Sequence, residues 1–142
     1  MSQSYAKLKE LYTRLVDSRD GYEQAFEHAT ETYFKPMLAE LKTERAEFAA
    51  AVRADLRKVG ENVDEEGSIL AGLHRSFLGV RDAVTGQDDD AIKAEIARGE
   101  EHLKKAYEAA VEEADGTTQA TLMTQKHKVD QAIERVEARE NA

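Results

Sequence analysis

Charged side chains interrupt the apolar stripes of this sequence at positions where chemistry could take place. Arg19, Arg45 and Lys126 each stand where apolar residues, recurring at steps of three and four, would place another apolar side chain. Glu95 lies beside a similar break in the segment that follows residue 88. Each of these positions is near the middle of a predicted helix, so antiparallel packing would bring them to one level. The sequence therefore predicts a central polar layer, made of Arg19, Glu23, Arg45, Glu95 and Lys126.

Charges inside a protein need partners, because an unpaired buried charge costs several kcal/mol. The available carboxylates are Glu23, Glu47, Glu95, Glu100 and Glu101. Arginine suits such partners, since its planar guanidinium can bond a carboxylate through two hydrogen bonds. The cations could instead lay their aliphatic stems on the core and extend their charges into water. The pattern leaves both arrangements open, together with a ligand or metal site.

A metal site is the most specific chemistry that a helical bundle could offer. The usual dinuclear site takes one Glu from each of two helices and a Glu-x-x-His pair from each of the other two. Here the third residue after Glu47 is Ala50, and the third residue before His127 is Thr124, so each candidate pair lacks one member. We therefore predict no cofactor. The alternative is a single iron or other divalent metal ion bound by Glu23, Glu47, Glu101 and His127.

A second polar group, His74 and Arg75, lies on a short apolar segment that begins after residue 67. His74 could act as a general base or a ligand if a carboxylate such as Glu100 oriented its ring. The other interpretation is a hydrogen-bonding residue at a helix junction. The sequence contains no phosphate-binding loop, dinucleotide motif or nucleophile elbow. We therefore predict no catalytic residue, and the sequence favours a protein that is not an enzyme.

The composition is that of one acidic domain. With 142 residues the chain suits a single domain, residues 1–142, and it contains no cysteine for disulfides or thiolate metal sites. Twenty basic and 29 acidic residues leave a net charge of −9, which repels nucleic acid and anionic membranes. No apolar run has the roughly 18 residues of a membrane span, and no signal-peptide pattern is visible. We therefore expect a cytoplasmic protein without nucleic-acid or membrane partners.

Helical periodicity runs along the chain, and no stretch alternates with the period of two that strands show. The stripes predict helices at about residues 3–29, 32–59, 68–85, 89–114 and 117–139. Pro36 suits the first turn of the second helix, Gly60 suits its end, and the acidic run 88–90 complements the positive start of the fourth. We therefore predict an all-α, antiparallel four-helix bundle with an extra short helix between its second and third long helices.

Short motifs spread over most of the chain resemble one known family. They are Asp20-Gly21-Tyr22, Arg45, Phe48, Gly67-Ser68, Ala71-Gly72, Leu73-His74-Arg75, Thr85-Gly86, Ala91-Ile92, Arg98-Gly99-Glu100 and Tyr107. The family is a bacterial group of ferritin-like, rubrerythrin-like four-helix bundles known as a domain of unknown function. The resemblance implies a long connection between the second and third long helices that contains the short helix. It implies no substrate, because the activity of the family is not settled.

Two functions of different classes follow from these observations. The first is a small acidic cytoplasmic bundle with a structural, interaction or, by resemblance, stress-associated role, which acts through a protein partner or self-association. The second is a degenerate ferritin-like protein that binds a metal through carboxylates and a histidine of the bundle core. A ligand pocket under the short helix, gated by His74 and Arg75, is a third hypothesis.

Overall fold

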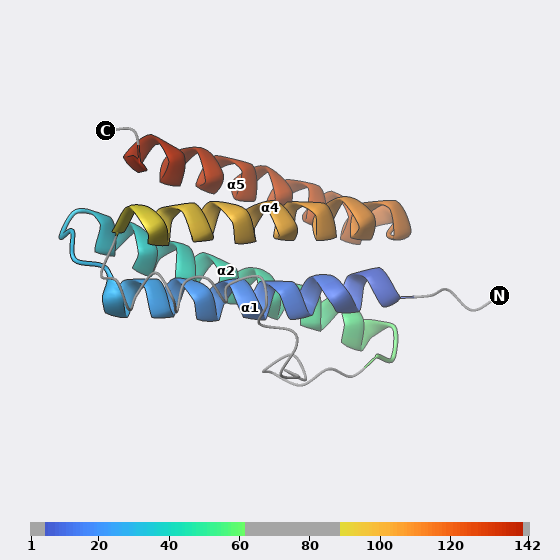
Figure 1. Cartoon of the computed structure of the whole chain (residues 1–142). Coiled ribbons are helices and arrows are strands. Elements are labelled where there is room, and N and C mark those ends of the chain that lie inside the picture. Colours follow the sequence, from blue (N-terminus) through green and yellow to red (C-terminus); the bar gives the residue numbers. More distant parts are fainter. Residues whose placement is uncertain (1–4, 62–88, 141–142) are drawn as a thin grey trace.

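Figure 1 shows a computed structural model of the chain, which describes residues 5–61 and 89–140 and, in the last helix, side chains as far as residue 136. The described residues form four α helices and no strand: α1 (Ala6–His28), α2 (Phe34–Lys58), α4 (Asp89–Glu113) and α5 (Gly116–Glu140). The all-α prediction is confirmed for these residues, and each helix begins and ends within three residues of its expected bounds. The expected short helix at about 68–85, with His74 and Arg75, lies outside the described residues.

The four helices lie side by side, and neighbours that touch run antiparallel (Figure 1). α1 contacts both α2 and α4, whereas α5 contacts α4 extensively and α2 over fewer residues. Because α2 and α4 are both antiparallel to α1, they point in the same direction (Figure 1). The end of α2 and the start of α4 therefore lie at opposite ends of the bundle.

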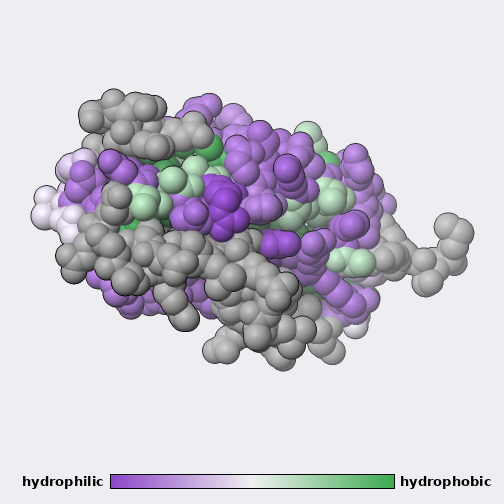
Figure 2. Space-filling view, viewed as in Figure 1, coloured by the Kyte–Doolittle hydropathy of each residue, from purple (hydrophilic) through white to green (hydrophobic). Residues whose placement is uncertain are grey.

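The core consists of two apolar clusters that follow one another along the bundle. The first contains Leu11, Leu15, Phe48, Val52, Leu103 and Val129, and the second contains Tyr22, Phe34, Leu38, Leu41, Ile92 and Ile96, among others. On each of the first three described helices the boundary between the clusters falls near the middle of the helix. On the face shown in Figure 2, the surface of the described residues is mostly hydrophilic, with small apolar patches. The middle of the bundle is therefore where polar side chains can enter the core.

The first residue of α4 holds the turn between α1 and α2. The Asp89 carboxylate accepts hydrogen bonds from the Thr30 backbone N–H at 3.0 Å, the Thr30 hydroxyl at 3.1 Å and the Glu31 backbone N–H at 2.8 Å. One turn later, the buried Lys93 places its ammonium 2.9 Å from a Glu31 carboxylate oxygen and 5.1 Å from the centre of the Phe34 ring. The sequence predicted only that the acidic run would complement the positive end of its own helix dipole. The contact of Asp89 with the turn between α1 and α2 was not predicted.

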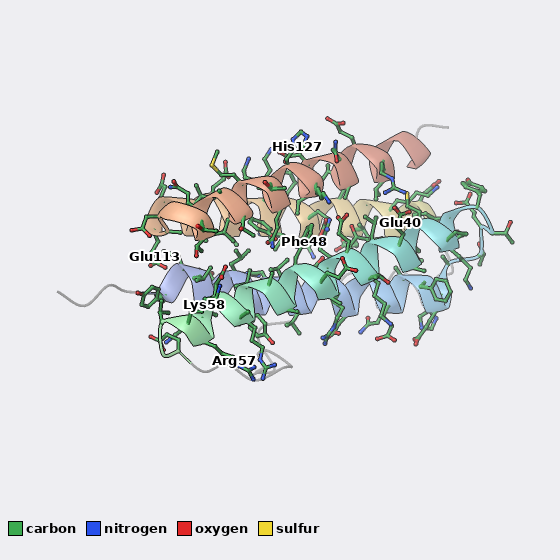
Figure 3. All side chains as sticks on the ribbon, turned by 180° about the vertical axis from the view of Figure 1, so that it is seen from behind. Glu40, Phe48, Arg57, Lys58, Glu113 and His127 are labelled. Carbon is green, nitrogen blue, oxygen red and sulfur yellow. The ribbon has the colours of Figure 1, made fainter. Side chains whose placement is uncertain are left out.

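Glu113, in the last turn of α4, caps the start of α1 at the other end of the bundle (Figure 3). Its carboxylate accepts hydrogen bonds from the backbone N–H groups of Lys7 at 3.4 Å and Leu8 at 3.2 Å. The first N–H groups of a helix have no partner within the helix, and Tyr5 at the N-cap position provides no side-chain cap. Glu113 supplies these missing acceptors and places a negative charge at the positive end of the α1 dipole.

Replacing Glu113 by alanine should lower the free energy of unfolding by about 0.5–1 kcal/mol, the usual contribution of a helix cap. Urea denaturation of the full chain, followed by circular dichroism, measures the loss. Glu108→Ala is the matched control, because Glu108 is an exposed residue of the same helix. Equal losses in the two variants would show that the capping contact does not stabilise α1.

Candidate functional site

The middle of the bundle contains a buried ion pair. Arg45 on α2 and Glu100 on α4 both have side chains that are 0% exposed. Arg45 Nη2 donates a hydrogen bond of 2.5 Å to Glu100 Oε2, and Arg45 Nη1 donates one of 2.6 Å to Glu44 Oε1. Ser18 on α1 donates a hydrogen bond of 2.9 Å from its hydroxyl to Glu100 Oε1. Side chains from three helices therefore meet at one charged pair, between the two apolar clusters.

Two aromatic rings flank the guanidinium of Arg45. Its Cζ atom lies 5.7 Å from the centre of the Tyr22 ring and 5.6 Å from the centre of the Phe48 ring. Cations at this distance from a ring face are attracted by its quadrupole, and more strongly away from water. The rings therefore stabilise the charge of Arg45 in addition to its carboxylate partners.

Protonation states at this site are set by burial and by the pair itself. Burial disfavours the charged guanidinium, but Glu100, Tyr22 and Glu44 together outweigh this effect and raise the pKa of Arg45 above its ordinary value. Burial, aided by the charge of Glu100, raises the pKa of the Tyr22 phenol well above its ordinary value. Arg45 is therefore always charged and Tyr22 always neutral near neutral pH, so neither serves as a base.

A second buried hydrogen bond connects α4 to α5. The Tyr107 hydroxyl donates to Gln125 Oε1 at 2.7 Å, and both residues are buried. Burial raises the pKa of Tyr107 above its ordinary value, so this phenol also remains neutral. Asp17, beside Ser18 on α1, is a further buried polar residue. The polar part of the core thus includes side chains from all four described helices.

The structure places the other residues of the predicted polar layer nearer the surface. Each forms an ion pair there: Arg19 with Asp20 at 2.9 Å, Glu23 with Lys42 at 3.0 Å, Glu95 with Arg98 at 2.8 Å and Lys126 with Asp130 at 3.7 Å. Their side chains are between 27% and 48% exposed. Of the five residues expected in the layer, Arg45 is the one that the structure buries.

The four candidate metal ligands lie on the outside of four different helices. Glu23, Glu47, Glu101 and His127 are all exposed, and His127 lies on the side of α5 that faces away from α2 (Figure 3). Within residues 5–61 and 89–136, no three His, Asp or Glu side chains are grouped so that they could hold a metal ion. The structure therefore does not bring this set together.

Ser18, Arg45 and Glu100 lie within a stretch that matches a known protein family. The model of a family described as a domain of unknown function, DUF2383, matches residues 3–113. The chain belongs to this family. The motifs predicted membership of a family known as a domain of unknown function, and this part of the prediction is confirmed. No curated protein and no solved structure matches the chain.

The DUF2383 match covers α1, α2 and α4 and ends where α4 ends. It therefore contains Ser18, Arg45 and Glu100, whereas α5 lies beyond it. None of the helices described for this DUF2383 chain combines the length and apolar character needed to cross a membrane.

Sequence reasoning missed Ser18 and did not assign Glu100 to the polar layer of this DUF2383 chain. Ser18 stands three residues after Leu15 and four before Tyr22, so it fits the apolar stripe of α1 as well as Arg19 does. A serine in such a stripe is a weak signal, because its small hydroxyl is often tolerated in a core. The residue that indicated the site was Arg45, because a buried arginine requires a carboxylate close to it in the core.

The site of the DUF2383 chain holds charge but offers little reactivity. Both carboxylate oxygens of Glu100 accept hydrogen bonds, one from Arg45 and one from Ser18. The suggested binding group of His74, Arg75 and Glu100 cannot be assembled from the structure, because His74 and Arg75 lie outside the described residues. What the described geometry supports is a fixed, buried charge pair inside a helical bundle, in which both carboxylate oxygens of Glu100 accept hydrogen bonds.

Proposed function

We propose that this DUF2383 chain is a small acidic helical-bundle protein that acts through contacts with other proteins rather than through catalysis. The observation that carries the proposal is the Arg45–Glu100 pair in the middle of the core. Helical bundles build cofactor and metal sites there, from side chains that project inward from facing helices. In this chain the guanidinium of Arg45 lies in that part of the core, beside the inward-facing carboxylate of Glu100.

Electrostatics supports the same proposal. A cation bound to Glu100 would lie close to the guanidinium that is hydrogen-bonded to the same carboxylate. Two unit positive charges about 4 Å apart repel by about 4 kcal/mol at an effective dielectric constant of about 20, and a divalent ion would roughly double this cost. Arg45 therefore neutralises Glu100 and opposes the binding of a metal ion beside it.

The direction of the helices supports a ferritin-like bundle, which we also propose. Bundles of that type have one long crossover connection, and the helices on either side of it point the same way. α2 and α4 point the same way here, and the 30 residues 59–88 lie between them. From the resemblance of its motifs to the rubrerythrin-like group, we further propose a cytoplasmic and stress-associated role.

Metal analysis of the purified full chain tests the proposed function. Protein produced with iron, manganese and zinc in the medium should contain far less than one metal ion per chain. The alternative, a degenerate ferritin-like protein with iron or another divalent metal at Glu23, Glu47, Glu101 and His127, predicts one tightly bound ion. That ion should disappear in Glu47→Ala and Glu101→Ala. A stoichiometric metal in the unmodified protein, lost in both variants, would replace our proposal by the alternative.

A further inference from the structure

A groove on the outer side of α4 and α5 contains an exposed apolar side chain. The groove has a volume of about 450 Å³, and its lining includes Glu108, Val111 and Glu112 from α4 and Met123, Lys126 and Asp130 from α5. Met123 is 57% exposed, the largest value among the exposed large apolar side chains of the described residues. Methionine is flexible and polarisable, and it is common on surfaces that adapt to a binding partner. The groove therefore offers an apolar anchoring point that the bundle itself does not use.

Carboxylates give one edge of this groove a negative charge. On α5, Asp130 lies 3.7 Å from the ammonium of Lys126 and 3.5 Å from that of Lys104, so its charge is compensated. On α4, Glu108 and Glu112 are exposed and one turn apart. The chain as a whole carries a net charge of −9, which attracts positively charged partners over longer distances.

We propose that the α4–α5 groove binds a basic amphipathic segment of a partner protein. An apolar side chain of the segment packs on Met123 and Val111, and lysine or arginine side chains meet Glu108 and Glu112. The residues from Met123 to Asp130 extend over about 10 Å of helix, which accommodates two turns of a helical partner. The proposal rests on the proposed function and specifies its binding surface and its class of partner.

A second groove, between α1 and α2, serves as an internal control. It has a volume of about 320 Å³ and is lined by Glu23, Phe26, Glu27 and Lys42, among others. Two of its residues already have charged partners: Glu23 pairs with Lys42 at 3.0 Å, and the Phe26 ring has the ammonium of Lys35, which is not part of the lining, 5.1 Å from its centre. This groove also combines carboxylates with an apolar side chain, but one of its carboxylates, Glu23, and its aromatic ring, Phe26, already contact a lysine.

Fluorescence anisotropy with the full chain and a labelled synthetic peptide tests the proposal. The probe is an amphipathic peptide of about 14 residues, four helical turns, made of leucine, alanine and lysine. Its counterpart has glutamate in place of every lysine. The basic peptide should bind, more weakly as salt increases, and the acidic peptide should not. Met123→Ser should weaken binding about fivefold, and Glu108→Gln with Glu112→Gln should weaken it and reduce its salt dependence.

Matched variants elsewhere on the bundle separate this groove from general attraction to an acidic protein. Phe26→Ser removes an apolar side chain from the α1–α2 groove, and Glu27→Gln with Glu47→Gln removes the same charge from other exposed positions. Both should leave the peptide affinity within about twofold of the unmodified protein, because distant surface charges are screened. Equal weakening by the two sets of variants would overturn the proposal.

Two further outcomes would contradict the proposed groove, and a third would separate it from the proposed function. Self-association of the chain that Met123→Ser abolishes would assign the groove to a second copy of the protein. Failure of the basic peptide to bind a metal-free protein would reject the groove while leaving the proposed function intact. A stoichiometric metal found together with groove-specific peptide binding would reject the proposed function and retain the groove.

Discussion

Replacing Arg45 by methionine is expected to lower the free energy of unfolding by about 3–5 kcal/mol, because it leaves the Glu100 carboxylate buried without its charged partner. Methionine is unbranched and apolar and replaces much of the arginine stem, so loss of charge rather than loss of volume dominates the effect. Urea denaturation at neutral pH measures it. A loss below about 0.5 kcal/mol would contradict a stabilising role of the buried pair.

Two companion variants isolate the cause. Arg135→Met removes an arginine that pairs with Glu40 at 3.1 Å on the surface, where the two side chains are 44% and 64% exposed. Exposed pairs contribute about 0–1 kcal/mol, so this variant should be nearly neutral. Arg45→Met combined with Glu100→Leu removes both charges and should be more stable than Arg45→Met alone. If the second substitution instead adds a further loss, packing rather than charge governs this position.

Replacing Asp89 by alanine is expected to lower the free energy of unfolding by about 2 kcal/mol, because hydrogen bonds to a charged group are among the stronger ones. The substitution removes the acceptor for the donors of Thr30 and Glu31 at the turn between α1 and α2. The control is Asp90→Ala, whose side chain is 75% exposed and lies 3.8 Å from Lys93. That variant should lose less than about 0.5 kcal/mol. Similar losses in the two would exclude a specific role for Asp89.

The contribution of Asp89 should depend on pH with a definite sign. Burial favours its protonated form, but the hydrogen bonds from Thr30 and Glu31 outweigh burial and lower the pKa of Asp89 below its ordinary value. The unfolded chain then binds this proton more readily, so the stabilisation is complete above about pH 5 and disappears as the pH falls through the folded-state pKa. The difference in stability between the unmodified protein and Asp89→Ala should therefore shrink below about pH 4. A difference that is constant with pH would contradict this assignment.

The long helices were predictable because their signals are local. Gly60 and Gly116 have φ values of +83° and +56°, a backbone region that favours glycine, and each lies next to a helix boundary. Pro36 is the third residue of α2, where its missing N–H costs nothing. Such features depend on a few neighbouring residues, so a single sequence is sufficient to predict them.

The composition of the buried site was predictable only in part, because a stripe does not fix which of two adjacent residues faces the core. Ser18 and Arg19 both fit between Leu15 and Tyr22. The helix rotation that decides between them follows from packing against α2 and α4, which the pattern of α1 does not contain. The link from Asp89 to Thr30 and Glu31 likewise could not be predicted from local sequence patterns, because Asp89 follows these two residues by 59 and 58 positions.

Contacts at the two ends of α4 have a consequence for how the lengths of α1 and α4 can vary. Asp89 holds the turn that follows α1 and Glu113 holds the beginning of α1, so the separation of Asp89 and Glu113 along α4 has to match the length of α1. Inserting or deleting one residue in either helix would displace one contact by about 1.5 Å and turn it by about 100°. A single-residue change in one helix therefore has to be matched in the other. Differences in chain length among DUF2383 proteins should accordingly accumulate outside this pair of helices.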